Sequence, residues 1–326
     1  MNYTPPFKIS TKIIDLISKI SLNIGKLEAT DSASTLPMLR KVNQIRTITG
    51  TLQIEGSTLD EERITALIEG KRVLGKVDEI AEANGAIALY KHLEKLNYKD
   101  EKELLRSHKI LMDELLKTAG TYRVIDVGVG GKDGVVHVAP PNGQIPKLMN
   151  ELFEWLSTTD EHPLIVSSVF HYEFEFIHPF IDGNGRMGRF WQSLILYNWN
   201  NYFSVIPIES IIRDKQQEYY KVLEECGGTG ESTLFIEFVL QSILEAIDKV
   251  GNKVGNKVGN LTDNQKMIVE QIQTNNKISA SKLADVVGIS KRKIEENLSK
   301  LREQGILERL GGTRGYWNLI DNKDFN

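Results

Sequence analysis

A chain of 326 residues is long enough for two or three domains with a substantial core. Its hydrophobic content of 40% and charged content of 26% are ordinary for a globular protein, and the net charge of −4 predicts no general attraction to nucleic acid. The single cysteine, Cys226, excludes an internal disulfide and a thiolate zinc cluster. No apolar run approaches bilayer-spanning length and the start does not resemble a signal peptide, so we expect a cytoplasmic protein without a membrane partner.

The first part of the chain is predicted to be helical. Apolar residues recur at helical spacing over residues 7–24 and again from Leu39 to Ile48. The second pattern continues to Thr51 and Glu55, which are four apart and therefore project from one helix face. Gly56 then allows a helix end or a close backbone approach. Taken alone, this pattern is weak evidence for a functional segment, because Glu55 could equally be a charged residue exposed to solvent on a helix.

Further helices and one hairpin are expected along the middle of the chain. Residues 120–130 and 135–138 are β-branched and punctuated by glycine, which predicts a short β-hairpin. Around it the apolar spacing is helical, over 59–88 with a break near 70–75, 101–117, 145–157, 163–177, 208–225 and 234–250. The predicted fold class is therefore mainly α, with one small hairpin in the helical core.

The segment from His178 to Arg189, His-Pro-Phe-Ile-Asp-Gly-Asn-Gly-Arg-Met-Gly-Arg, carries the most chemistry. It joins a helix that ends near His178 to a helix that begins near Arg186. A Gly-rich turn at a helix N-terminus offers free backbone N–H groups and the positive end of the dipole, which suit phosphate oxygens. Arg186 and Arg189 are three apart, so they can bind the same polyphosphate from one face of the first turn.

Individual side chains of this loop suit a reaction on a polyphosphate. Asp182 is a hard oxygen ligand whose natural partner is Mg²⁺. Asn184 can donate to phosphate oxygens, and Gly183 and Gly185 allow the backbone to approach a ligand closely. His178 is the one residue type in the loop that can deprotonate a hydroxyl near neutral pH. A histidine capping a buried helix, followed by a solvated turn, is the simpler interpretation, but it leaves the combination of groups unexplained.

The segment resembles the signature of the Fic (filamentation induced by cyclic AMP) family, usually written HPFx[DE]GNGRxxR, and meets every fixed position of it. The resemblance implies a helical core that transfers AMP from ATP to a protein hydroxyl, with His178 as general base and Asp182 as the Mg²⁺ ligand. A Walker P-loop, GxxxxGK[ST], is absent from the sequence. Contacts to ATP are then expected from the hairpin, the loop and a later helix, at Val127, Gly128, Val129, Gly130, Asp182, Gly183, Asn184, Gly185, Arg186, Met187, Gly188, Arg189, Tyr219 and Tyr220.

The resemblance also implies a role for the segment around Glu55. Thr51 to Gly56 resembles the inhibitory helix of the family, in which the glutamate pairs with the second arginine of the signature, here Arg189. We expect a bidentate pair that blocks productive placement of ATP. The hairpin at residues 120–138 resembles the flap that covers the active site and pairs with the target backbone by strand addition. An ordinary exposed hairpin is the alternative.

The tandem Tyr219 and Tyr220 resembles the wall that sandwiches adenine in Fic domains, although core or surface packing would also explain it. Some family members carry an adenine-binding asparagine just after this helix. Here residues 226–229 are Cys-Gly-Gly-Thr, so we expect base recognition to differ in detail.

A repeat separates the last part of the chain. Lys-Val-Gly-Asn occurs three times over residues 249–260 and predicts a flexible linker. Residues 261–326 contain three helical patterns and a possible β-hairpin wing, and are similar to winged helix-turn-helix domains. Lys291, Arg292 and Lys293 on the third helix, with Arg314 on the wing, could contact DNA. Such domains also serve in dimerisation or protein docking, so a homodimer is an alternative to DNA contact.

We therefore divide the chain into an N-terminal region with the inhibitory helix (1–95), a Fic core (96–248), the linker (249–260) and the winged helix-turn-helix (261–326). The predicted activity is Mg²⁺-dependent transfer of AMP from ATP to Ser, Thr or Tyr hydroxyls of an unknown target protein and of the enzyme itself, restrained by Glu55. Two alternatives remain: removal of AMP from a modified protein, with Glu55 positioning water, or a DNA-binding regulator whose Fic core senses nucleotide.

Overall fold

A computed structural model describes residues 3–30, 36–131, 134–258, 262–303, 306–310 and 315–319. Its internal contacts divide the chain into two units, Met1–Asp248 and Lys249–Asn326. Within the described ranges, no helix combines the length and the apolar character needed to cross a membrane.

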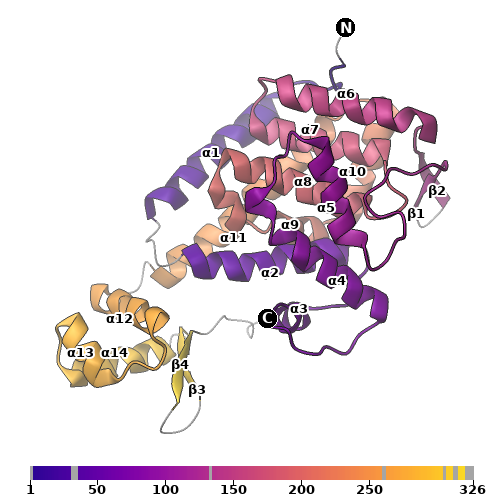
Figure 1. Ribbon diagram of the computed structural model, residues 1–326. Coiled ribbons are helices and arrows are strands. Elements are labelled where there is room, and N and C mark those ends of the chain that lie inside the picture. Colours follow the sequence, from indigo (N-terminus) through magenta and orange to yellow (C-terminus); the bar gives the residue numbers. More distant parts are fainter. Residues whose placement is uncertain are drawn as a thin grey trace. The chain divides into compact units, whose positions relative to one another are not determined.

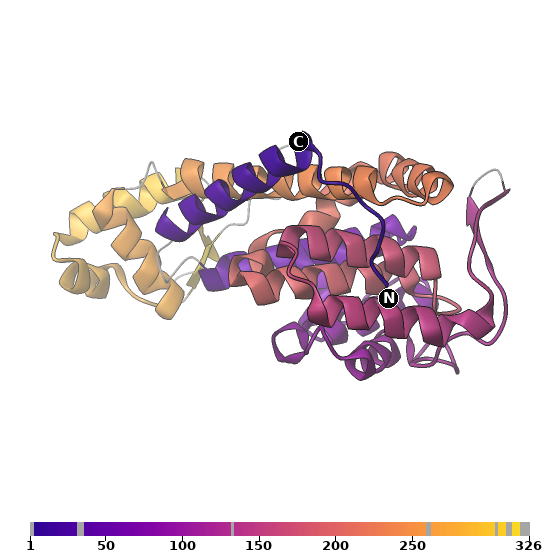
Figure 2. The same ribbon diagram turned by 90° about the horizontal axis from the view of Figure 1, so that it is seen from above.

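The first unit is built almost entirely of helices, which confirms the predicted class (Figure 1). Its antiparallel hairpin, β1–β2, lies at the edge of the helical body in both views (Figures 1 and 2). The elements are α1 (Thr11–Thr30), α2 (Leu36–Ile54), α3 (Glu61–Ile68), α4 (Val77–Tyr90), α5 (Glu101–Met112), β1 (Gly128–Gly131), β2 (Gly134–Val138), α6 (Ile145–Thr158), α7 (Pro163–Ile177), α8 (Asn184–Trp199), α9 (Ile208–Asp214), α10 (Gln216–Thr229) and α11 (Thr233–Val258).

The two helices that flank the signature loop, α7 and α8, form the centre of the core. Most of α7 is buried, and its sequence is apolar on nearly every face, as expected for a helix enclosed by others. Phe170 of α7 stacks on Trp191 of α8 with ring centroids 6.3 Å apart, and both side chains are fully buried. Truncating such an aromatic residue typically costs about 3–5 kcal/mol. The loop between α7 and α8 is therefore anchored at both ends by a tightly packed helix.

One predicted helix is observed as two. The helix expected over residues 208–225 is broken at Lys215, whose N–H donates to the carbonyls of Ile211 and Ile212 and so tightens the last turn of α9. A new helix, α10, then starts at Gln216 and continues through residues 226–229 to a left-handed cap at Gly230. The glycines inside α10 cost only about 1 kcal/mol each, so they do not end a helix by themselves.

The linker prediction also requires correction. Helix α11 continues through Val258 and so includes most of the Lys-Val-Gly-Asn repeat, where we expected a linker from residue 249. The early part of α11 is fixed by buried residues such as Phe235 and Ile243. Once a helix is nucleated, each added residue gains a hydrogen bond, which offsets the poor helix propensity of glycine.

The second unit contains the three helices and the wing that the sequence predicted. They are α12 (Asp263–Thr274), α13 (Ala280–Val287), α14 (Lys291–Glu303), β3 (Leu307–Leu310) and β4 (Tyr316–Leu319), with β3 and β4 antiparallel. Thr262 caps α12 in a capping box with Gln265, and the Ser279 hydroxyl accepts from the N–H of Lys282 at the start of α13. Arg314, expected on the wing, lies outside the described residues.

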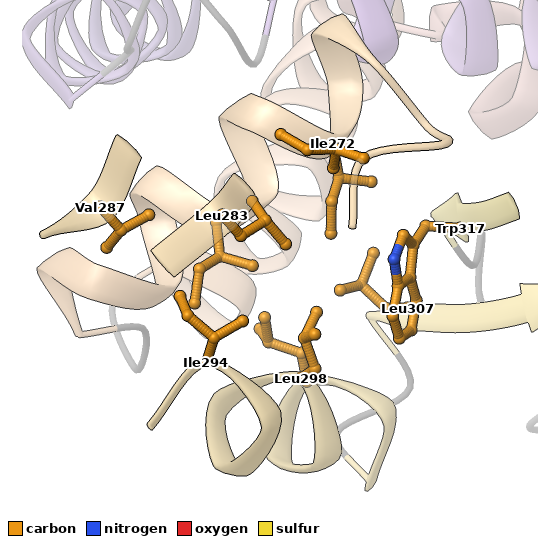
Figure 3. Packing of buried hydrophobic residues seen from close by; sticks show 10 residues of the cluster. Ile272, Leu283, Val287, Ile294, Leu298, Leu307 and Trp317 are labelled. Atoms are coloured by element: carbon orange, nitrogen blue, oxygen red, sulfur yellow. The ribbon is translucent and has the colours of Figure 1, made fainter. Parts of the chain in front are cut away.

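This unit has a hydrophobic core of its own. Leu283 of α13, Ile294 and Leu298 of α14, and Trp317 of β4 point toward one another in its centre (Figure 3). Leu307 of β3 is completely buried in the same cluster. The unit therefore has the packed interior that a winged helix-turn-helix domain needs.

Candidate active site

His178 lies at the end of α7 in an unusual backbone conformation. Its φ and ψ are 49° and 60°, and among the described residues other than glycine it alone has a positive φ. Its N–H donates to the carbonyl of Phe174 at 2.9 Å, so the residue caps the helix. A left-handed conformation costs a residue with a Cβ roughly 1–2 kcal/mol. Surrounding contacts must therefore hold His178 in this position.

The loop after His178 is closed by Asn184. The Phe180 N–H donates to Asn184 Oδ1, and Asn184 Nδ2 donates to the Phe180 carbonyl, both at 2.9 Å. Asn184 is only 2% exposed. The sequence suggested that this amide binds phosphate, but in the structure both ends of it are engaged by the backbone of the loop.

His108 of α5 supports the same loop and was not anticipated. Its ring stacks on Phe180, with centroids 3.6 Å apart and planes within 2°. Nδ1 accepts from the N–H of Gly120 at 2.8 Å, so Nε2 carries the proton and donates to the Asp182 carbonyl at 3.0 Å. Burial lowers the pKa of His108 to about 4. A neutral imidazole therefore fixes the backbone beneath the predicted metal ligand.

Asp182 lies on the exposed side of the loop and pairs with the buried Arg186. Both hydrogen bonds to the Asp182 carboxylate from described residues use Oδ1: the Gly183 N–H donates at 2.6 Å and Arg186 Nη2 at 3.1 Å. The Asp182 side chain is 57% exposed. No cluster of three or more metal-binding side chains occurs within the described ranges. Mg²⁺ commonly takes several of its oxygen ligands from phosphates and water, so one carboxylate such as that of Asp182 is compatible with such an ion.

Arg186 retains unused donors. Its side chain is 4% exposed, and Nη1 lies 3.3 Å from Glu82 Oε1 on α4. Neither Nη1 nor Nε donates a hydrogen bond to any described residue. A buried guanidinium whose N–H groups lack hydrogen-bond acceptors is well suited to bind an anionic oxygen.

Arg189, by contrast, is held by the end of α2. Nη2 donates to Glu55 Oε1 at 2.6 Å and to the Thr51 carbonyl at 3.2 Å, while Nε donates to Thr51 Oγ1 at 2.9 Å. The side chain is 1% exposed. Burial alone would lower the pKa of Arg189, but the neighbouring carboxylates, above all Glu55, raise it above its ordinary value. The expected bidentate pair is not formed: Nη2 alone donates to Glu55, Nε donates to Thr51, and Nη1 has no hydrogen-bond partner among the described residues.

The cap of α2 explains why Thr51, Glu55 and Gly56 occur together. The N–H of Gly56 donates to Gln53 O, and that of Ser57 to Leu52 O, in the pattern of a Schellman cap. This cap needs a positive φ at Gly56, which is 92°. Glu55 N–H turns to Leu52 O, which leaves the Thr51 carbonyl for Arg189. The guanidinium thus also lies at the negative end of the α2 dipole.

Gly185 makes room for this contact. A Cβ at Gly185 would overlap Glu55 Oε1 and lie 3.0 Å from Arg189 Nη1. The second glycine of the GNG motif is therefore required for the close approach of the glutamate to the arginine.

Helix α10 holds the same end of α2 from the other side. The Ile54 carbonyl accepts from Gln216 Nε2 at 2.5 Å and from the Tyr220 hydroxyl at 3.2 Å. Tyr220 is 45% exposed, whereas Tyr219 is buried and its hydroxyl lies 3.0 Å from His171 Nε2. In this state only the second tyrosine of the predicted adenine wall is accessible.

The remaining predicted contacts are placed as follows. Met187 is fully buried, and Gly188 faces α7, where a Cβ would lie 2.9 Å from His171 Cδ2. Val127 immediately precedes β1, and Gly128, Val129 and Gly130 belong to that strand, with an irregularity in the register after Val129.

Comparisons with known proteins agree with this geometry. Residues 98–196 match the Fic/DOC family, and residues 261–308 match a winged helix-turn-helix DNA-binding family. The crystal structure of a Fic family protein from Desulfovibrio desulfuricans G20 is 38% identical, with a TM-score of 0.74 over 99% of this chain and 100% of that one. The chain belongs to the Fic family.

Other relatives match over a shorter span. The protein adenylyltransferase Fic of Nematostella vectensis is 29% identical over 243 residues, which are 69% of this chain and 53% of that protein. The protein of the same name from Aedes aegypti is 28% identical over 64% of this chain and 42% of its own length. The chain thus spans about half the length, or less, of these curated relatives. Fic-1 from C. elegans, 19% identical with a TM-score of 0.62, shares the fold.

Proposed function

We propose that this protein transfers AMP from ATP to a Ser, Thr or Tyr hydroxyl of a protein, itself included, and that Glu55 restrains the reaction. The observation that carries the proposal is the arrangement of the signature loop. His178 stands at its start, Arg186 has two nitrogens without a hydrogen bond to a described residue, and Nη2 of Arg189 is occupied by Glu55 at the end of α2. The names of the relatives, protein adenylyltransferase Fic, support the same reaction.

In the proposed reaction the target hydroxyl oxygen attacks the α-phosphorus of ATP. A new O–P bond forms as the bond to pyrophosphate breaks, and His178 accepts the hydroxyl proton. Arg186 would donate to phosphate oxygens through Nε and Nη1 and so neutralise charge that develops on them. Asp182 would hold Mg²⁺, which, when bound, neutralises charge on the polyphosphate.

The restraint follows from competition for one guanidinium. Arg189 can bind a phosphate oxygen through Nη2 only if Glu55 leaves that nitrogen. The carboxylate also adds a negative charge beside the expected polyphosphate, so ATP would bind in a pose unsuited to in-line attack. Removing the carboxylate should therefore activate the protein.

The experiment compares ATP labelled at the α-phosphate with ATP labelled at the γ-phosphate, using the Glu55→Gly variant. AMP transfer predicts that protein acquires the α-label and no γ-label. Glu55→Gly combined with His178→Ala should lose about 10²–10⁴-fold in rate, while ATP binding, measured by calorimetry, persists. Transfer of the γ-label would indicate a kinase, and an active His178→Ala variant would remove the assignment of the base.

We further infer that the second unit binds DNA through the start of α14. The matching family is described as DNA-binding, and α14 begins with Lys291, Arg292 and Lys293. Lys291 and Arg292 pair with Glu295 and Glu296 at 3.8 and 3.2 Å, but such exposed pairs are weak and leave the cations available to phosphates. Replacing all three basic residues by alanine should reduce both the affinity for duplex DNA and its salt dependence. Binding that is unchanged would assign the unit to protein contacts.

A further inference from the structure

Arg123 lies in the loop between α5 and β1 and is almost completely buried, with 3% exposure. Its guanidinium donates to backbone carbonyls of three segments. Nε donates to His178 O at 2.8 Å, Nη1 to Ile125 O at 2.7 Å, and Nη2 to Pro140 O at 2.6 Å. Its own N–H donates to Pro179 O at 2.9 Å.

These carbonyls belong to functionally distinct parts of the proposed site. Ile125 precedes β1 and Pro140 follows β2, so both ends of the hairpin meet at this side chain. The carbonyls of His178 and Pro179 open the signature loop. One side chain therefore connects the hairpin to the residue that we propose as the base.

The charge of Arg123 is not balanced by a close carboxylate. Asp126 approaches Nη1 at 3.9 Å and is 70% exposed. Burial lowers the pKa of Arg123, with a smaller opposing effect from Asp126, yet an arginine stays protonated in proteins. Carbonyl oxygens at the C-terminal end of α7, where the helix dipole is negative, offset the burial of the charge. The buried guanidinium therefore fixes the positions of the carbonyl groups around it and does not form a close ion pair.

We infer that Arg123 is a positioning residue that holds His178 in its left-handed conformation and in fixed register with the hairpin. The inference rests on the proposed function, in which His178 accepts the proton of the target hydroxyl. A strained backbone persists only where its surroundings determine it. Here the carbonyl of His178 and that of the following residue are both held by Arg123.

Lysine cannot replace arginine in this role. Its ammonium is a single point of charge, whereas the planar guanidinium reaches four carbonyls, those of Ile125, Pro140, Ile177 and His178, in fixed directions. Arg123→Lys therefore keeps the charge and loses the geometry, which separates positioning from electrostatics. Arg46→Lys is a matched control, because Arg46 of α2 donates to Asn43 and is partly exposed, away from the loop.

The test is made in the Glu55→Gly background with α-labelled ATP. Arg123→Lys should lower kcat about 10–100-fold, since a base displaced by about 1 Å can cost that much. The KM for ATP should stay within about twofold, because the proposed phosphate contacts come from other residues, and Arg46→Lys should change neither constant. Combined with His178→Ala, Arg123→Lys should cause no further loss. An unchanged kcat, or an equal loss without His178, would overturn the inference.

A second measurement does not depend on activity. In protein with labelled histidines, the His178 ring signal, assigned by its loss in His178→Ala, should shift in Arg123→Lys and stay in place in Arg46→Lys. If Arg123→Lys does not fold, Arg123→Gln, which keeps one donor group on a shorter chain, is used instead. An unmoved His178 signal would contradict the inference. If Glu55→Gly itself transfers no AMP, the proposed function fails, while this signal still decides the role of Arg123.

Discussion

At the scale of residues, both signature arginines pair with carboxylates, and each keeps nitrogens without a hydrogen bond to a described residue. Arg189 is bound by Thr51 and Glu55 through Nε and Nη2, whereas Nε and Nη1 of Arg186 form no such hydrogen bond. The loop that precedes them is fixed by His108 and closed by Asn184. In the proposed function, Arg186 is ready to bind an anion, whereas Nη2 of Arg189 is occupied by Glu55.

The protonation of His108 tests the support beneath the loop. Above pH 6.5 the ring is neutral in both the folded and the unfolded chain, so it adds no pH dependence to stability. Between pH 6.5 and about 4 the His108 ring becomes protonated in the unfolded chain but stays neutral in the folded chain. This lowers the free energy of unfolding by about 1.4 kcal/mol per pH unit, or about 3 kcal/mol in all. NMR titration of the His108 ring should show a midpoint near pH 4, and a midpoint at the ordinary value would contradict the buried neutral tautomer.

At the scale of elements, the end of α2 is held from two sides. Arg189 of α8 binds the Thr51 carbonyl, and α10 supplies Gln216 and Tyr220 to the Ile54 carbonyl. These are carbonyls that the last turn of a helix leaves without an intrahelical partner. The position of Glu55 therefore depends on α10, although α10 does not touch the carboxylate in any described contact.

Removing one of these contacts should activate the protein without touching Glu55 or Arg189. Gln216→Ala deletes a hydrogen bond of about 1 kcal/mol, so self-labelling should rise about fivefold. Gln217→Ala, its exposed neighbour on the same helix, is the control and should change little. Labelling from α-labelled ATP measures both. Equal rates for the two variants would show that α10 does not hold the inhibitory segment.

The elements that could be predicted from the sequence are those with a recognisable pattern in consecutive residues. The helices around the signature follow apolar spacing, and the loop was found because its functional residues are contiguous from His178 to Arg189. His108 and Arg123 were missed because they bind backbone carbonyls of distant segments, and such contacts leave no residue-specific pattern. The break at Lys215 was missed because both helices continue the same spacing of apolar residues across it.

At the scale of the whole molecule, the chain contains two units with separate cores. Trp317 and the apolar residues of α12, α13 and α14 form one of them, while the signature loop lies in the other. The proposed chemistry uses residues of the first unit alone. We therefore expect the first unit to be active without the second.

Deleting residues 261–326 tests this division. The shortened protein should fold and retain self-labelling within about twofold, because an independently packed domain can be removed at a boundary with few contacts. Circular dichroism establishes folding, and α-labelled ATP measures activity in the Glu55→Gly background. A folded but inactive truncation would place the second unit in the catalytic assembly.

The most direct test of the account compares four proteins: the natural sequence, Glu55→Gly, Arg189→Ala and the double variant. We expect this partly buried ion pair to bias the pose of ATP by about 2–3 kcal/mol, or on the order of a hundredfold in rate. Self-labelling by α-labelled ATP should therefore rise about a hundredfold in Glu55→Gly and fall again when Arg189→Ala is added. Equal labelling of the natural protein and Glu55→Gly would show that this glutamate does not restrain the enzyme.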